Sequence, residues 1–193
     1  MDRAARKAHM AEAVWQVIRD RGIGAVSVRS VADQAGVAVG SLRHLFPTRA
    51  ELLEFSAELM VERATERVRG VPPTEDVQQY ALEVVKHLLP LEPNSRAELE
   101  VNIALIAESP ALPELVTVRD RAYQELAEGC TRLVEMLVGR PRDPRIVARG
   151  RRLHAIVDGL AIHLLMQPPS EDSGWAITIV RDELARIARE ETA

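Results

Sequence analysis

The sequence predicts an all-α protein, and three observations carry that prediction. Segments between the prolines repeat apolar residues at helical spacing, and none shows the strict alternation of apolar and polar residues that is typical of strands. Only 3% of the residues are aromatic although 47% are hydrophobic, so the core consists of Leu, Val, Ile and Ala, which suits packed helices. Prolines separate the periodic segments, at positions 47, 72, 73, 90, 93, 110, 113, 141, 144, 168 and 169.

The first predicted helix covers about residues 3–20. Its apolar residues at i, i+3, i+4 and i+7 are Ala11, Val14, Trp15 and Ile18. They share one face of a helix, and the helix is expected to end in the turn at 21–24, which contains Gly22 and Gly24.

Two short helices are predicted between residues 27 and 46. Ser27 is suited to cap the first of them, and Gly36 permits the positive φ that ends it abruptly. The second begins near Ala38 and ends at Pro47. Its inward side is formed by Leu42, Leu45 and Phe46.

A long helix is predicted from Thr48 to about Gly70, because Thr48 and Glu51 have the spacing of a capping box. The remaining helices are predicted at about 74–89, 95–108, 113–138, 144–167 and 173–190.

The distribution of charge divides the chain into a basic segment and an acidic remainder. Residues 1–50 hold eight Lys or Arg and four Asp or Glu, a net +4, and because the whole chain carries -4, the rest carries -8. Such an asymmetry favours a nucleic-acid-binding segment joined to an acidic body. There is neither an apolar run of about 18 residues nor a secretory signal, so we expect a cytoplasmic protein.

The pair of short helices has the form of a helix-turn-helix, with Ala35-Gly36-Val37 as the turn. Spacing and composition alone leave an ordinary helical hairpin within a bundle as an open alternative. Lone Cys130 forms neither an intrachain disulfide nor a thiolate metal site, and no further Cys or His stands at ligand spacing. We therefore expect no metal and no cofactor.

The segment 27–49 resembles the DNA-binding motif of the TetR family of transcriptional regulators. The positions of the family motif are occupied by Ser27, Ala35-Gly36-Val37, Ala38, Gly40-Ser41-Leu42, Arg43, His44-Leu45-Phe46 and Arg49. Arg43 departs from the family, which most often has a phosphate-binding Tyr at this position, and Leu45 stands where a second Tyr or His is common. The resemblance implies a helix-turn-helix DNA-binding domain over residues 1–50 and a helical effector-binding and dimerisation domain over 51–193.

Carried over by position, the resemblance implies a set of DNA-contacting residues. They are Ser27, Arg29, Val39, Gly40, Ser41, Arg43, His44, Thr48 and Arg49. Arg29 would reach DNA from the start of its helix, Gly40 would permit close approach, and Ser41 and His44 would face base edges or phosphates. Thr48 and Arg49 would hold a phosphate at the start of the long helix.

The resemblance further implies that the last two helices form a dimer interface. Their apolar stripes could pair with those of a second copy as a four-helix bundle. The residues assigned to this interface are Val157, Gly159, Leu160, Ala161, Leu164, Ile177, Val180, Leu184 and Ile187. The alternative is that both stripes pack inward on their own subunit.

Polar side chains on apolar helical faces are the candidates for effector binding. Asn102 lies among Leu99, Ile103 and Ile106, so its amide is expected to be buried and to need a partner, either protein or ligand. The other candidates are His87, Tyr123, Asp158, His163 and Trp175. His154 and Asp158 are i, i+4 neighbours and could equally form a hydrogen-bonded pair.

Together these features predict a ligand-responsive regulator, a repressor that binds a palindromic DNA operator as a homodimer and is released by a small-molecule effector. The alternative is a helical dimer that binds a ligand or protein without recognising specific DNA. An enzyme is not expected, because the chain has no Gly-rich phosphate loop, no Gly-x-Ser-x-Gly and no repeated Glu-x-x-His.

Overall fold

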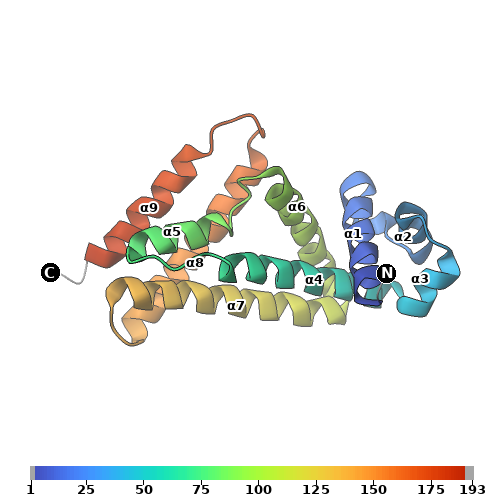
Figure 1. Ribbon diagram of the computed structural model, residues 1–193, viewed down its shortest axis with the longest axis horizontal. Coiled ribbons are helices and arrows are strands. Elements are labelled where there is room, and N and C mark those ends of the chain that lie inside the picture. Colours follow the sequence, from blue (N-terminus) through green and yellow to red (C-terminus); the bar gives the residue numbers. More distant parts are fainter. Residues whose placement is uncertain (1–2, 190–193) are drawn as a thin grey trace. The chain divides into compact units, whose positions relative to one another are not determined.

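The computed structural model describes residues 3–189, and every regular element within that range is helical (Figure 1). The elements are α1 (Arg3–Arg21), η1 (Ile23–Ala25), α2 (Val28–Ala35), α3 (Val39–Leu45), α4 (Arg49–Arg69), α5 (Val77–Lys86), α6 (Pro93–Glu108), η2 (Ser109–Ala111), α7 (Pro113–Val138), α8 (Pro144–Met166) and α9 (Gly174–Arg189). The predicted all-α class is confirmed. No helix in the described range is both long and apolar enough to cross a membrane.

Predicted and observed helix ends agree within two residues, except that α5 is three residues shorter at each end than the predicted 74–89. Helix α5 starts only at Val77, because the carboxylate of Asp76 accepts hydrogen bonds from the amides of Gln78 and Gln79 and caps it there. Helix α6 starts early, at Pro93, since proline is well tolerated in the first turn of a helix, where its missing N–H is not needed.

The chain forms two compact units. The first comprises Met1–Arg63 and Ala97–Arg121, and the second comprises Ala64–Arg96 and Ala122–Ala193. Helices α4, α6 and α7 each begin in one unit and end in the other, so the chain passes between the units within helices.

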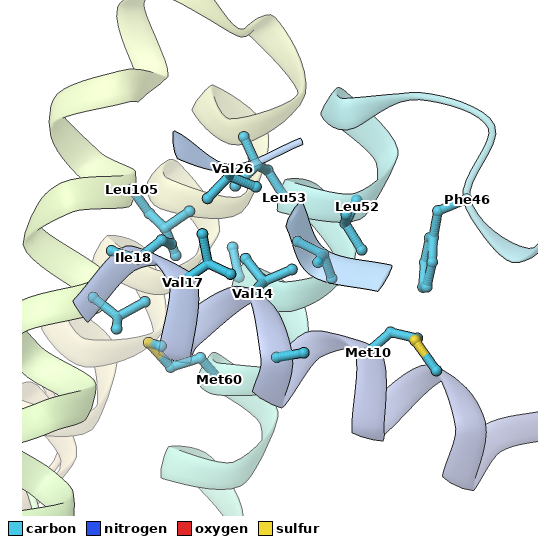
Figure 2. Packing of buried hydrophobic residues seen from close by; sticks show 14 of the residues in the cluster. Met10, Val14, Val17, Ile18, Val26, Phe46, Leu52, Leu53, Met60 and Leu105 are labelled. Atoms are coloured by element: carbon cyan, nitrogen blue, oxygen red, sulfur yellow. The ribbon is translucent and has the colours of Figure 1, made fainter. Parts of the chain in front are cut away.

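The core of the first unit is built around α1. Its buried residues Val14, Val17 and Ile18 pack with Leu52 and Leu53 of α4 (Figure 2). The same cluster includes four buried residues from α6 and α7, namely Val101, Leu105, Leu115 and Val118. The first unit therefore extends beyond the helix-turn-helix, because these distant residues complete its core.

In the second unit, parts of α4, α6 and α7 join the whole of α5, α8 and α9. At the crossing of α7 and α8, Gly150 lies directly against Thr131, and a Cβ at position 150 would be 2.8 Å from the Thr131 Cα. At the far end of α8, the guanidinium of Arg96 donates to the carbonyls of Leu164, Leu165 and Gln167. These bonds satisfy carbonyls that the end of a helix leaves without partners.

Candidate functional site

Helix α2 is held at its first turn by two serines. The Ser27 hydroxyl accepts a hydrogen bond from the Ser30 amide at 3.0 Å, and the Ser30 hydroxyl accepts one from the Ser27 amide at 2.9 Å. This is the expected N-cap, and it occupies the hydroxyl of Ser27. The Ser30 hydroxyl also donates to the carbonyl of Ala25 at 2.7 Å, which ties α2 to the preceding turn η1.

The turn between α2 and α3 depends on a glycine in the left-handed region. Gly36 has φ 66° and ψ 33°, and the Val37 amide donates to the Ala32 carbonyl at 3.0 Å. Other residues adopt this conformation at a cost, because their Cβ crowds the backbone. The two short helices on either side of this turn form the predicted helix-turn-helix.

Helix α3 has a buried side and an exposed side. Leu42 is fully buried and Phe46, just beyond the helix, is 2% exposed, so these two residues anchor α3 on the core. Exposed predicted contact residues on α2 and α3 are Arg29, Gly40, Ser41, Arg43 and His44. The remaining predicted contact of α3, Val39, is half-buried and packs against the core.

The last two predicted contacts lie at the start of α4, where Thr48 directly precedes the helix and Arg49 is its first residue. The Thr48 hydroxyl accepts a hydrogen bond from the Glu51 amide at 3.1 Å, as a capping box requires. The Glu51 carboxylate lies 3.1 Å from that hydroxyl and accepts from it, instead of reaching the backbone of Thr48. Thr48 is exposed.

Arg49 has a different environment from the one predicted for it. Its three guanidinium nitrogens donate to the Val26 carbonyl at 3.0 Å, the Ile23 carbonyl at 3.1 Å and a Glu108 carboxylate oxygen at 2.9 Å. All these partners belong to the first unit. The structure therefore does not group Arg49 with the exposed residues of α2 and α3, because its guanidinium is directed at protein acceptors.

Sequence reasoning missed residues of α1 that position the helix-turn-helix. A ring nitrogen of His9 lies 3.1 Å from the Ala35 carbonyl at the end of α2. The Lys7 ammonium lies 5.1 Å from the ring centroids of both Phe46 and Phe55, a cation–π arrangement. These partners are 26 or more residues away along the chain, and no local pattern signals them.

Two of the predicted effector residues meet at a buried histidine in the second unit. His154 is 5% exposed, and its Nε2 lies 3.3 Å from a carboxylate oxygen of Asp158. The Tyr123 ring lies 5.0 Å from the His154 ring, centroid to centroid, and is itself 58% exposed. Tyr123, His154 and Asp158 therefore form one cluster between α7 and α8, which we call the His154 cluster.

The other effector candidates are not gathered there. Asn102, which was expected to be buried, is exposed, because the buried face of α6 passes through Val101 and Leu105 instead. His87 and His163 are exposed. The Trp175 indole N–H donates to the Gln167 side chain at 3.1 Å, next to the start of α9. Asn102 lies in the first unit and the remaining candidates lie in the second.

The predicted dimer residues mostly face the interior of their own subunit. Those that are buried within the second unit are Val157, Leu160, Ala161, Leu164, Val180, Leu184 and Ile187. Ile177 is half-buried and Gly159 is exposed. The apolar stripes of α8 and α9 thus pack inward, which was the alternative interpretation of their periodicity.

Other apolar side chains of α8 and α9 are exposed. Ile162 is 42% and Met166 75% exposed on α8, and Trp175 is 38% and Ile179 43% exposed on α9. We call these four residues and exposed Gly159 the outer α8–α9 face.

Comparison with known proteins gives two matches to family sequence models. The model described as bacterial regulatory proteins of the tetR family matches residues 10–54, which contain α2 and α3. The model described as the C-terminal part of BetI-type transcriptional repressors matches residues 77–189, more than half of the chain.

A relative and two solved structures extend these matches over the whole chain. The HTH-type transcriptional regulator PksA of Bacillus subtilis is 31% identical over 202 residues, covering 100% of this chain and 94% of that protein. A transcriptional regulator from Rhodococcus has a TM-score of 0.83 at 24% identity, with 95% of this chain and 96% of that chain covered. A regulator from Saccharomonospora viridis, solved in complex with choline, has a TM-score of 0.81 at 21% identity, with 95% and 97% covered. The chain therefore belongs to the TetR family of transcriptional regulators.

Proposed function

We propose that the protein is a ligand-responsive repressor that binds a palindromic operator as a homodimer. The observation that carries this proposal is the exposed polar side of α2 and α3, held in place by Leu42, Phe46 and the Gly36 turn. A short helix anchored on one side and polar on the other fits the major groove of B-DNA. The +4 charge of residues 1–50 favours approach to phosphates.

Within this surface, Arg29 and Arg43 are the cationic contacts. Both are exposed, and an arginine can bind a phosphate or donate two hydrogen bonds to guanine. Ser41 and His44 supply shorter polar contacts, and Gly40 permits close approach of the α3 backbone. Thr48 contacts DNA through its backbone, since its hydroxyl serves as a helix cap, whereas Ser27 acts by capping α2, because its hydroxyl and its amide are both bonded to Ser30.

A second copy of the chain covers the outer α8–α9 face in this proposal. Gly159, Ile162 and Met166 follow i, i+3 and i+7 spacing, so they lie on one side of α8. Trp175 and Ile179 are i, i+4 neighbours and so lie on one side of α9. The exposed glycine allows two helices to approach closely, and the apolar neighbours supply surface toward the roughly 1,200–2,000 Å² that a stable interface buries.

We assign effector binding to the region matched by the BetI-type model. Support comes from the choline complex of the Saccharomonospora viridis regulator and from the net charge of -8 on residues 51–193, which favours an organic cation. The His154 cluster, with an exposed tyrosine ring and an exposed carboxylate, offers the two kinds of group that bind such cations. A coupling of about 1–3 kcal/mol would change operator affinity roughly 5- to 150-fold.

The proposal is tested by selecting genomic DNA fragments with the purified protein at a fixed salt concentration of about 0.15 M. We expect enrichment of a palindrome, and its loss in the double variant Arg29→Ala, Arg43→Ala. The control is Arg69→Ala, Arg145→Ala, which removes two exposed positive charges from the second unit and should leave selection intact. Weak, sequence-independent retention by all three proteins would favour a helical dimer without an operator.

A further inference from the structure

The guanidinium of Arg49 joins three separate parts of the first unit. It comes from the first turn of α4 and donates to carbonyls at the turn η1 and to the carboxylate of the last residue of α6. We call Arg49, Glu108 and the carbonyls of Ile23 and Val26 the Arg49 cluster. Its three hydrogen bonds are 2.9–3.1 Å long, which is ordinary length for charge-assisted bonds.

The two carbonyls in this cluster bracket η1, the turn that leads into α2. Ile23 begins η1 and Val26 directly follows it. The Ser30 hydroxyl holds the same turn from the other direction, through the Ala25 carbonyl at 2.7 Å. The entry to α2 is therefore fixed by Arg49 on one side and by the α2 cap on the other.

Glu108 completes the cluster from a segment 59 residues away in the chain. The side chains of Arg49 and Glu108 are only 33% and 25% exposed, so solvent screens their attraction less than it would at an open surface. The next residue, Ser109, is fully buried, and its hydroxyl donates to the Ile106 carbonyl and accepts from Arg119. The carboxylate of Glu108 thus projects from a firmly held helix end.

We infer that Arg49 is a positioning residue for the helix-turn-helix and that Glu108 determines operator affinity through it. Arg49 acts by holding η1, and so α2, against the end of α6, with its donors used on protein acceptors instead of a phosphate. The inference rests on the proposed binding of DNA. It assigns a role in operator recognition to an acidic residue that carries the wrong charge to touch DNA.

The test compares variants that separate positioning from phosphate contact. Arg49→Lys keeps the positive charge but cannot form three planar hydrogen bonds, and Glu108→Gln removes only the carboxylate charge. Affinity is measured for an operator duplex selected by the wild-type protein and for an unrelated duplex of equal length. Glu114→Gln, at an exposed position in the first turn of α7, serves as the control for loss of one negative charge.

We expect Arg49→Lys and Glu108→Gln each to weaken operator binding by ~10-fold, corresponding to the loss of one charge-assisted hydrogen bond. The operator affinity of the double variant should lie within about twofold of that of the weaker-binding single variant, because both changes break the same cluster. Affinity for the unrelated duplex and its dependence on salt should stay near the wild-type values. Glu114→Gln should match the wild type on the operator.

A phosphate contact by Arg49 gives the opposite pattern and would overturn the inference. Arg49→Lys would then retain operator affinity, Glu108→Gln would leave it unchanged or increase it, and Arg49→Met would lower the salt slope by about 0.9 on both duplexes. Under our inference Arg49→Met loses operator affinity with an unchanged slope.

Hydrogen exchange in the free proteins distinguishes failure of this inference from failure of the proposed function. If the wild type selects no operator, the proposed function fails, while the Arg49 cluster is still tested by exchange of the amides of residues 25–31. Faster exchange there in both Arg49→Lys and Glu108→Gln, with exchange in α9 unchanged, supports the positioning role. Wild-type protection in both variants contradicts it.

Discussion

At the scale of single residues, two arginines that lie close together in the sequence have different environments in the fold. Arg43 is exposed on α3, whereas Arg49, six residues later, is bound to two carbonyls and a carboxylate. The difference lies in the neighbours that the fold supplies, since both are cations near the helix-turn-helix. In the second unit, Arg152 and Arg186 both donate hydrogen bonds to the buried carboxylate of Glu183.

Glu183 makes the stability of the second unit depend on pH. Its side chain is 6% exposed, and hydrogen bonds from Arg186 and then Arg152 lower its pKa below the ordinary value of 4.5. A depressed folded-state pKa adds stability that is fully present above the unfolded-state pKa and is lost as the pH falls through the folded-state pKa. Glu183→Gln should therefore be destabilised by about 2 kcal/mol at pH 7 and progressively less below about pH 4.5.

Urea unfolding at pH 7 and at pH 3.5 checks this expectation. Asp182→Asn, at the exposed neighbouring position, is the control and should change the midpoint little at pH 7. An equal loss for Glu183→Gln at both pH values would mean that packing, and not the ionised carboxylate, carries the effect.

At the scale of elements, the crossing of α7 and α8 depends on a glycine at position 150. Gly150 of α8 is buried against Thr131 of α7, whereas Gly129 of α7 has no neighbouring atom within 4 Å of where its Cβ would be. Both are glycines inside helices, where glycine costs roughly 1 kcal/mol relative to alanine. Only the first has a packing reason for its presence.

Gly150→Ala should destabilise the protein by about 1–3 kcal/mol. The added Cβ would lie 2.5 Å from the Thr131 hydroxyl oxygen and 2.8 Å from the Thr131 Cα, so the two helix backbones must separate. Thermal or urea unfolding measures the change. Gly129→Ala is the matched control, and by helix propensity it should stabilise the protein by up to about 1 kcal/mol. Similar effects of the two substitutions would show that the helix crossing is not tight at Gly150.

At the scale of the whole molecule, the proposed function requires two helix-turn-helix motifs related by a twofold axis. A palindromic operator places its half-sites about 34–36 Å apart, so the subunit contact sets which DNA can be bound. In the proposed dimer that contact is the outer α8–α9 face, whose apolar side chains are exposed in a single chain.

Met166→Glu should therefore produce a folded monomer with much weaker operator binding. Met166 is 75% exposed, so the substitution costs little within the subunit, while a charge buried between two copies is strongly unfavourable. Sedimentation velocity and circular dichroism measure assembly and folding. Met136→Glu, at a methionine of α7 that is 47% exposed, should leave assembly unchanged. A dimeric Met166→Glu protein would place the subunit contact elsewhere.

The positions of the helices, the turn at Gly36 and the family were predictable from the amino-acid sequence. Helix α7 was predicted at its observed bounds, Pro113–Val138, because its proline start and apolar period are local signals. The helix-turn-helix motif was equally clear, since its glycine and its small and apolar residues lie within one continuous stretch.

Only the tertiary structure decided which neighbour each helix face meets. The stripes of α8 and α9 were visible in the sequence, but an apolar stripe does not say whether its own subunit or a second copy covers it. Asn102 is exposed because α6 turns a different face to the core, and Arg49 meets Glu108 across 59 residues. Helical periodicity is set by contacts three or four residues apart, whereas burial and ion pairing depend on residues that only the folded chain brings together.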